Sequence, residues 1–300
     1  MILNASGCLD ALAAPEVARS LDAFVTKTVT PLPRGGNRPV RIAETDVGML
    51  NSIGLANPGR DRFLGQTLPR LARELGSVPI WVSVGGFSAE DYATTCGLLG
   101  RDEVAAIELN LSCPNVDDAP ETAAEIVAAC RAATGIPLWA KLSPATWDVG
   151  EVARAVADAG ADGLSLVNTI RGLALDPRTL RPVLGTGTGG LSGPALRPIA
   201  LAAVHACFRA TGLPIVGMGG VETGRHALEL LAAGAAHVAL GTVLFADPDA
   251  PARVREELAA ELAARGLRDP SEVVGLAHDV IHRGVEDVEK PLLIVENRSN

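Results

Sequence analysis

Several residue classes are scarce in this chain, and each shortage excludes a kind of protein. Aromatic residues make up 3% of the 300 residues, and the five cysteines are odd in number with no C-x-x-C pair among them. These features argue against a disulfide framework, a structural zinc site and an iron–sulfur cluster held by the chain itself. No stretch approaches about 18 uninterrupted apolar residues, and residues 1–14 lack a basic start followed by a long apolar run. A membrane span and a secretory signal are therefore not expected.

Basic charge is scarce as well. Lys and Arg total 26 against 35 Asp and Glu, which gives a formal net charge of −9 and a pI of about 5.1. The arginines are scattered, so the chain has no basic stripe of the kind that neutralises nucleic-acid phosphates or binds an anionic membrane. We expect a cytoplasmic protein with no nucleic acid and no membrane as partner.

Short β-branched apolar runs alternate with Ala- and Leu-rich segments of helical period, which indicates a parallel sheet built from βα units. The predicted strands are 2–6, 23–28, 79–85, 105–111, 137–142, 163–168, 214–219 and 237–241. The predicted helices are 15–22, 68–76, 88–100, 121–134, 148–160, 194–212, 223–234 and 251–265.

Eight βα units predict an α/β fold of one (β/α)8 TIM barrel. We assign residues 1–278 to a single barrel domain and leave 279–300 as a charged C-terminal tail of unknown role. An open doubly wound sheet is less favoured, because it commonly has about six strands and a glycine fingerprint at its first turn. The G-x-G-x-x-G at 185–190 lies in a long loop instead, so we do not expect it to bind a dinucleotide.

Two connections are much longer than the others, 29–67 and 169–191, and both follow predicted barrel strands. A loop longer than about 15 residues in a compact domain is commonly a lid or a binding loop. Barrels of this type place their active sites at the C-terminal ends of the strands. We therefore expect both connections to belong to the functional face.

Lysine is rare but placed at strand ends. Of the three lysines, Lys27 closes the second predicted strand and Lys141 lies in the fifth. A lysine offers a compact positive charge that can sit beside a ring or a carboxylate, so both positions are candidate functional sites. The structural alternative is a lysine that reaches solvent or pairs with a buried acid.

Amide side chains gather at the same ends. Asn51, Asn110, Asn115 and Asn168 lie at strand ends or in the loops that follow them. Their combined donors and acceptors suit a planar ligand with NH and C=O edges, such as a pyrimidine or a flavin ring. Asn57, which precedes Pro-Gly, is better explained as a turn residue.

One cysteine stands among these polar residues. Cys113 lies in Asn110-Leu-Ser-Cys-Pro-Asn115, immediately beyond the fourth predicted strand. A thiol needs modest help to act as a thiolate near neutral pH, so we interpret Cys113 as a general base or nucleophile. The cysteines expected to be small buried hydrophobes within helices are Cys96, Cys130 and Cys207.

Glycine turns follow the last two predicted strands, at 217–220 and 241–242. Loops in these positions commonly hold a phosphate, because glycine lets backbone NH groups approach the anion. The histidines have no metal-ligand spacing and no carboxylate pair stands at the strand ends, so no metal is expected. The residues alone predict a barrel that binds a phosphorylated cofactor and holds a planar polar ligand among lysines, asparagines and one thiol.

Taken in order, these motifs resemble those of the class 1 dihydroorotate dehydrogenases, which are FMN-containing barrels of pyrimidine biosynthesis. The matching segments are Ala5-Ser-Gly7, Lys27-Thr28, 48–59, Glu108-Leu-Asn-Leu-Ser-Cys-Pro-Asn-Val116, Lys141-Leu-Ser-Pro144, 161–169, 189–194 and Gly217-Met-Gly-Gly220. The Gly-Gly-Leu-Ser-Gly-Pro segment at 189–194 is most similar to the NAD-linked (1B) subgroup. The resemblance implies oxidation of (S)-dihydroorotate to orotate by hydride transfer to FMN.

The resemblance also implies the site, position by position. The implied FMN contacts are Ser6, Lys27, Thr28, Asn110, Lys141, Val167, Gly193, Gly219, Gly220, Gly241 and Thr242. The implied substrate contacts are Lys27, Asn51, Ser52, Ile53, Gly54, Leu55, Asn110, Asn115, Asn168 and Thr169. Three residues have implied catalytic roles: Cys113 removes the C5 proton while a hydride leaves C6, Lys27 lies near the substrate carboxylate, and Lys141 lies beside the reduced flavin.

Reoxidation of the flavin needs a partner. This chain has neither a cysteine cluster for an iron–sulfur centre nor a dinucleotide fingerprint. In the subgroup that it resembles, a separate electron-transfer subunit carrying FAD and a [2Fe-2S] cluster performs that step. The resemblance therefore implies a heteromeric complex built on a homodimer of this chain.

Two departures from the family pattern leave alternatives open. Ser83 stands where NAD-linked members usually place an FMN-contacting asparagine, and the loop after Asn115 is shorter than is common in the family. Such a loop excludes water and completes the site when it closes. The alternatives are an FMN-dependent oxidoreductase for another dihydropyrimidine, a flavin-binding homologue without turnover, and a Schiff-base aldolase that uses Lys27 or Lys141.

Overall fold

The computed structural model describes residues 1–111 and 120–278, and the predicted tail at 279–300 lies outside them. Its centre is an eight-stranded parallel sheet. The strands are β1 (Ile2–Asn4), β2 (Phe24–Val25), β5 (Ile80–Val84), β6 (Ala106–Asn110), β7 (Leu138–Leu142), β8 (Gly163–Leu166), β11 (Ile215–Met218) and β12 (His237–Leu240). They follow the order β1-β12-β11-β8-β7-β6-β5-β2, and each coincides with one of the eight predicted strands.

Contacts between β1 and β2 bring the two edges of this sheet together. A parallel bridge joins Leu3 to Ala23. The side chain of Asn4 strengthens the seam, because its Oδ1 accepts from Val25 N and its Nδ2 donates to Val25 O, both at 2.8 Å. The sheet therefore rolls into the TIM barrel that the sequence predicts.

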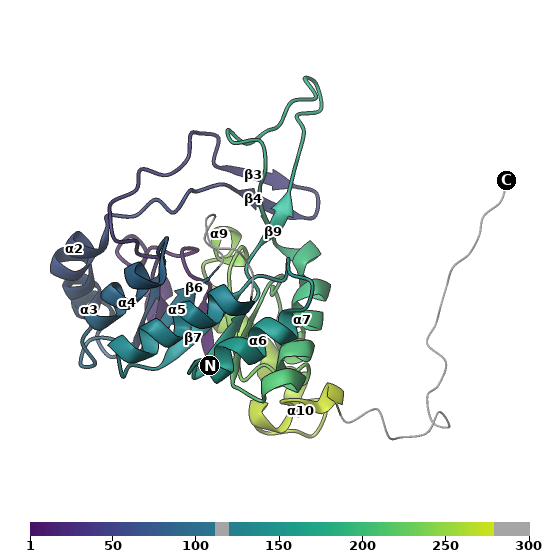
Figure 1. Ribbon diagram of the computed structural model, residues 1–300. Helices are drawn as coiled ribbons and strands as arrows, with labels where there is room; N and C mark the ends of the chain where they lie inside the picture. Colours follow the sequence, from purple (N-terminus) through teal and green to yellow (C-terminus); the bar gives the residue numbers. More distant parts are fainter. Residues whose placement is uncertain (112–119, 279–300) are drawn as a thin grey trace.

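Helices cover the outside of the barrel, as Figure 1 shows. The predicted helices appear as α1 (Pro15–Arg19), α3 (Leu68–Leu75), α4 (Ala89–Gly97), α5 (Pro120–Ala133), α6 (Val149–Asp158), α7 (Arg197–Thr211), α8 (Gly224–Ala232) and α10 (Ala250–Ala263). The short elements α2 (Arg60–Arg62), η1 (Phe63–Thr67), α9 (Val243–Ala246) and η3 (Pro270–Glu272) were not predicted, and η2 (Pro194–Leu196) leads into α7. None of the described helices is long and apolar enough to cross a lipid bilayer.

Local sequence fixes several helix starts. Asp148 accepts hydrogen bonds from the backbone N–H groups of Gly150 and Glu151 and so caps α6. Thr223 caps α8 in the same way by accepting from the N–H of His226. These caps set where each chain segment leaves the barrel mouth and turns back along its outside.

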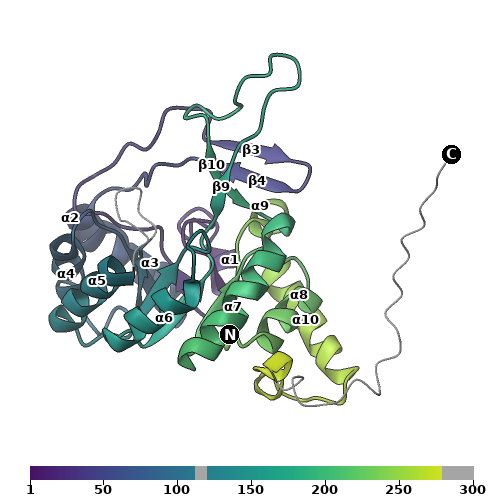
Figure 2. The ribbon, with the colours of Figure 1, turned by 45° about the vertical axis from the view of Figure 1, so that its right-hand side comes forward.

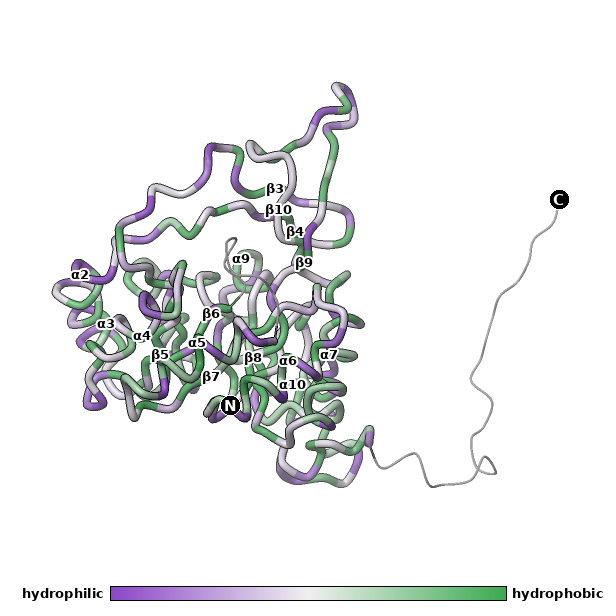
Figure 3. Tube along the Cα trace, viewed as in Figure 1, coloured by the Kyte–Doolittle hydropathy of each residue, from purple (hydrophilic) through white to green (hydrophobic). Residues whose placement is uncertain are grey.

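The core has two layers, one inside the barrel and one between the strands and the helices. The inner cluster comprises Leu3, Ala23, Val25, Trp81, Ala106, Trp139, Val216, Met218 and Ala239. Trp81 and Trp139 pack with ring centroids 4.8 Å apart, and a Cβ at Gly163 would come within 2.6 Å of the Trp139 ring, so glycine makes room there. In Figure 3, stretches in the hydrophobic colour recur along the barrel strands and the helices, between hydrophilic stretches. Cys96, Cys130 and Cys207 are buried in helices, as predicted.

A second sheet lies above the mouth of the barrel (Figures 1 and 2). It is antiparallel and consists of β3 (Ile42–Thr45), β4 (Gly48–Asn51), β10 (Gly189–Ser192) and β9 (Ile170–Gly172), in that order. We call it the upper sheet. Its strands come from the two long connections, so segments far apart in the sequence form one structure over the mouth. The G-x-G-x-x-G at 185–190 runs into β10 and opens no helix.

Candidate active site

A cavity of about 670 Å³ lies between the C-terminal ends of the barrel strands and the upper sheet. Its volume falls within the range of roughly 300–1,000 Å³ that is usual for small-molecule sites. Barrels of this architecture place their active sites on this face. The cavity is therefore the candidate active site.

The predicted site residues that the structure describes all line this cavity. They are Ser6, Lys27, Thr28, Asn51, Ser52, Ile53, Gly54, Leu55, Asn110, Lys141, Val167, Asn168, Thr169, Gly193, Gly219, Gly220, Gly241 and Thr242. Cys113 and Asn115 lie outside the described residues. The barrel strand ends and the upper sheet thus bring together positions that span most of the chain.

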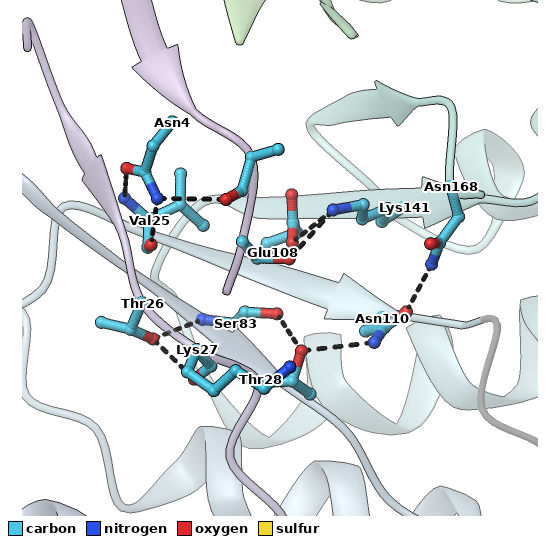
Figure 4. A network of polar contacts seen from close by, with 12 residues as sticks. Asn4, Val25, Thr26, Lys27, Thr28, Ser83, Glu108, Asn110, Lys141 and Asn168 are labelled. Atoms are coloured by element: carbon cyan, nitrogen blue, oxygen red, sulfur yellow. Dashed lines mark hydrogen bonds and ion pairs between the residues drawn. The ribbon is translucent and has the colours of Figure 1, made fainter. Parts of the chain in front are cut away.

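A buried ion pair joins Lys141, which lines the cavity, to Glu108, which lies beneath the lining. Lys141 Nζ donates to Ser6 Oγ at 2.9 Å and lies 3.5 Å from Glu108 Oε1 (Figure 4). Lys141 is 5% exposed and Glu108 is 1% exposed. A buried charge needs a partner of this kind, because desolvation otherwise penalises it heavily. Lys141 therefore pairs with a buried acid, which is the structural alternative considered from the sequence. It also lines the cavity, where a ligand can reach it.

Lys27 has different surroundings in the same cavity. Within residues 1–111 and 120–278, no hydrogen bond or ion pair reaches its ammonium group. Burial lowers the pKa of Lys27 below its usual value, the Cys8 thiol opposes this effect, and the positive charge of Lys141 adds to it. A Cβ on Gly7 would stand 2.9 Å from Lys27 Nζ, so glycine leaves room for the lysine. A half-buried cation without a partner favours the binding of an anion such as a carboxylate.

A chain of hydrogen bonds holds Asn110, at the end of β6, and Asn168, just after β8. Asn168 Nδ2 donates to Asn110 Oδ1 at 3.1 Å, and Asn110 Nδ2 donates to Thr28 Oγ1 at 3.3 Å. Thr28 Oγ1 in turn lies 3.0 Å from Ser83 Oγ. Ser83 is fully buried and is not among the cavity-lining residues, so it supports Thr28 from behind. The chain fixes two amide groups at the cavity wall, where they can read the edges of a planar ring.

Glycine backbone lines another part of the wall. Gly219 and Gly220 follow β11 with φ angles of +123° and +70°, which favour glycine. A Cβ on Gly220 would approach Gly193 O to 2.9 Å. Thr242 Oγ1 donates to Ser192 Oγ at 2.8 Å and ties the second glycine turn to the upper sheet. Backbone that a ligand can approach this closely suits a phosphate group.

The turn at 51–55 forms part of the roof. Asn51 Nδ2 donates to Gly190 O at 3.3 Å, which links β4 to β10. Leu55 has a φ of +56°, an uncommon conformation for a residue other than glycine. Asn57 Nδ2 donates to Leu55 O at 2.7 Å and is absent from the cavity lining, so it stabilises this turn.

Sequence reasoning missed some residues around the cavity. Cys8, left ambiguous, lines the cavity, and burial raises the pKa of its thiol, an effect that Lys141 and Lys27 oppose. Ser192 was missed because it lies in the upper sheet, whose strands were not predicted. Glu108 was assigned no role, although its place two residues before Asn110 in a buried strand signals an inward-facing side chain.

These groups fit FMN, the cofactor that the resemblance implies. The glycine cradle at Gly219 and Gly220 would receive the phosphate, and Lys141 would place a positive charge beside the ring. Among the described residues, no group of three or more His, Cys, Asp or Glu side chains could hold a metal ion. The arrangement can bind an anionic, amide-edged ring against a flavin and stabilise negative charge on that flavin.

Sequence comparisons identify proteins that this chain is similar to. The family model for dihydroorotate dehydrogenase matches residues 1–262. The catalytic subunit of dihydroorotate dehydrogenase B (NAD(+)) from Desulforudis audaxviator (strain MP104C) is 46% identical over 266 residues, which cover 86% of this chain and 86% of that protein. The protein of the same name from Latilactobacillus sakei subsp. sakei (strain 23K) is 43% identical over 281 residues, covering 89% and 91% of the two chains.

A solved structure shares the fold. The crystal structure of DHODH from Eimeria tenella in complex with ferulenol aligns with a TM-score of 0.79 and covers 92% of this chain and 85% of that chain. The two sequences are 24% identical over the alignment, so this likeness is evidence for the barrel fold alone.

Proposed function

Because this chain belongs to the dihydroorotate dehydrogenase family, we propose that it oxidises (S)-dihydroorotate to orotate in pyrimidine biosynthesis, as an oxidoreductase acting on a CH–CH group. The observation that carries the proposal is the cavity in which Lys27, whose ammonium group has no polar partner among residues 1–111 and 120–278, faces the same space as the Asn110–Asn168 pair. Dihydroorotate has a ring with amide edges and one carboxylate. The two asparagines match those edges, and Lys27 matches the carboxylate.

The family is flavin-dependent, and we infer that the flavin here is FMN. Gly219, Gly220, Gly241 and Thr242 would hold its phosphate. The residues that would contact the rest of the molecule are Ser6, Lys27, Thr28, Asn110, Lys141, Val167 and Gly193. When bound, FMN supplies the acceptor for the hydride that leaves the substrate.

The chain's own residues do the remaining chemistry. Oxidation removes a proton from C5 and a hydride from C6, and the C5–C6 bond becomes double. We assign Cys113, outside the described residues, as the base whose thiolate takes the C5 proton, a step that contributes roughly 10² to 10⁴-fold. Lys27 and the asparagines orient the ring. Lys141 places a fixed cation where negative charge develops.

The electrons must then leave the site. The relatives are named catalytic subunits of a B-type enzyme, which implies a separate electron-transfer subunit. We propose that this chain works with such a subunit, carrying FAD and a [2Fe-2S] cluster, around a homodimer core in the cytoplasm. Residues 1–278 would be one barrel domain in that complex.

Formation of orotate in the presence of an artificial electron acceptor tests the proposal without the partner subunit. We expect dihydroorotate to be oxidised at least about 100-fold more efficiently, in kcat/KM, than dihydrouracil, which has no carboxylate for Lys27. Equal efficiency on the two compounds would favour an enzyme for another dihydropyrimidine.

A cysteine variant tests the proposed base. Cys113→Ser should retain FMN and lose about 10² to 10⁴-fold in turnover near neutral pH. Cys130→Ala, which changes a buried cysteine in α5, is the matched control and should keep nearly full turnover. Full activity of Cys113→Ser would contradict the assignment.

A further inference from the structure

A carboxylate lies inside the barrel beneath the cavity, and the reaction proposed above does not use it. Glu108 of β6 is 1% exposed and lies two residues before Asn110, so both side chains project into the barrel. Strand pairing sets Glu108 beside Trp139 and Asn110 beside Lys141. Glu108 therefore lies one layer deeper than Lys141, in register with Trp139 of the inner core.

Glu108 is connected to the cavity through one side chain. Its Oε1 lies 3.5 Å from Lys141 Nζ, and the side chains are 2% and 6% exposed (Figure 4). Lys141 Nζ also donates to Ser6 Oγ at 2.9 Å. Lys141 and Ser6 line the cavity and Glu108 does not. In the part of the chain that the structure describes, Lys141 is the cation paired with this carboxylate.

The other groups around Lys141 explain why an anion beneath it matters. Lys27 faces the same cavity, and the positive charge of Lys141 contributes to the lowered pKa of Lys27. Cys8 lies near both, and Ser165 of β8, the strand partner of Lys141, is neutral. Two cations beside buried walls favour the loss of a proton from either one. Glu108 is the described carboxylate that offsets this repulsion at Lys141.

We propose that Glu108 is a positioning residue: from beneath the cavity it holds Lys141 Nζ in place and keeps it charged, so that a fixed cation faces the flavin ring. The proposal rests on the proposed function, because it assumes a flavin above Lys141. A cation held ready before the reaction needs no reorganisation when negative charge develops beside it. Without Glu108, Lys141 would lose its proton more readily and its ammonium group would lose one of its two anchors.

The scarcity of lysine allows a direct test on the flavin-free protein. With three lysines in the chain, protein labelled with carbon-13 at lysine Cε gives three side-chain signals, which Lys141→Arg and Lys290→Arg assign. We expect Glu108→Gln to lower the proton affinity of Lys141 by about tenfold or more. The matched control is Glu103→Gln, which removes the same charge from an exposed turn before β6 and should change that affinity less than about twofold. Equal titrations in the two variants would overturn the proposal.

A second measurement joins the proposal to the reaction. The measurement is single-turnover reduction of the FMN-loaded protein by dihydroorotate. As pH rises, the rate in Glu108→Gln should begin to fall at a lower pH than in wild type, because Lys141 would lose its proton earlier. Glu108→Asp should restore the wild-type pH profile in part. Dihydroorotate affinity should change less than about twofold, because Glu108 does not line the cavity. If dihydroorotate does not reduce the wild-type protein, the proposed function fails whatever the variants do. If the wild type is reduced and Glu108→Gln keeps its pH profile and its lysine titration, the positioning role alone is wrong.

A stability comparison covers the case in which Glu108→Gln does not fold. Lys141→Met leaves the Glu108 carboxylate buried without its partner, whereas the double variant Glu108→Gln/Lys141→Met removes both charges. Breaking a buried pair from one side destabilises a protein more than replacing both partners. The double variant should therefore melt at a higher temperature than Lys141→Met. A double variant that melts at the same or a lower temperature would contradict the pairing.

Discussion

Lys141 and Lys27 line the same cavity but differ in their polar partners. Lys141 has Glu108 and Ser6, whereas among the described residues nothing pairs with Lys27. An unpaired, half-buried cation destabilises the empty protein and strengthens the binding of an anion. The same residue therefore links binding to stability, as is common for residues in functional sites.

Replacing Lys27 should separate those two effects. Lys27→Met should raise the melting temperature of the flavin-free protein at pH 7 by about 2–4 °C, the shift that roughly 1 kcal/mol gives a domain of this size. It should weaken dihydroorotate binding to the FMN-loaded protein by about 100-fold. Thermal melts and an equilibrium titration measure the two changes.

The pH dependence of the stability gain is the internal control. The folded pKa of Lys27 lies below the unfolded value of 10.5, so folding favours the neutral amine. The stability at this site is present above the unfolded pKa and is lost as pH falls through the folded pKa. The gain in stability from Lys27→Met should therefore shrink as the pH rises toward the pKa of lysine in the unfolded chain. An advantage that grows with pH would contradict this explanation.

His237 gives a second pH-dependent prediction, at the opposite end of the barrel from the cavity. Its ring lies 5.9 Å from the Trp139 ring, and burial lowers the pKa of His237 from its usual 6.5 to about 4. Because the folded value is depressed, the stabilisation is present above pH 6.5 and is lost as pH falls through the folded value. Less than about 3 kcal/mol is at stake, because solvent screens part of the effect on this partly exposed ring. His237→Leu should flatten the fall in unfolding free energy between these limits, measured by denaturant titration, and parallel curves for the two proteins would contradict it.

The upper sheet joins the two long connections, which are distant in the sequence, into one roof over the cavity. β4 and β10 pair across more than a hundred residues, and Asn51 reinforces the pairing through Gly190 O. The barrel strands were predictable because strands covered on both sides are continuous apolar runs followed by helical segments. The upper strands are short and partly exposed, and β10 opens with two glycines, so no local pattern marks them as strands. Length alone pointed to the two connections.

A substitution at Gly190 tests whether the upper sheet positions the substrate. A Cβ added there would collide with Thr169 Oγ1 and stand 2.7 Å from Thr169 Cβ. Thr169 is β-branched and adapts poorly, so β10 or Thr169 must move. Gly190→Ala should raise the KM for dihydroorotate by about tenfold or more and leave FMN affinity within about twofold.

The control for this variant is Gly35→Ala in the first long connection. A Cβ on Gly35 would meet no atom within 4 Å, so its KM should match that of wild type. Indistinguishable KM values for the Gly190 and Gly35 variants would show that the roof does not position the substrate.

At the level of the whole molecule, the cavity brings together charged and polar residues from segments that are far apart in the chain. The chain has a formal charge of −9, yet both lysines that the structure describes face the one space that an anionic substrate must enter. Local charge in a cleft outweighs net charge in attracting a ligand. Placement at strand ends was enough to predict that Lys27, Lys141 and the glycine turns would lie together on this face of the barrel. Glu108 could not be assigned a role, because its contact with Lys141 depends on how the two side chains lie inside the folded barrel.

The visible spectrum of the FMN-loaded protein, recorded without oxygen before and after one addition of dihydroorotate, is the decisive test of the proposed reaction. We expect the flavin absorbance to bleach, orotate to appear in proportion, and dihydrouracil to leave the spectrum unchanged. A protein that binds FMN and keeps its oxidised spectrum after dihydroorotate is added would show that it does not catalyse this oxidation.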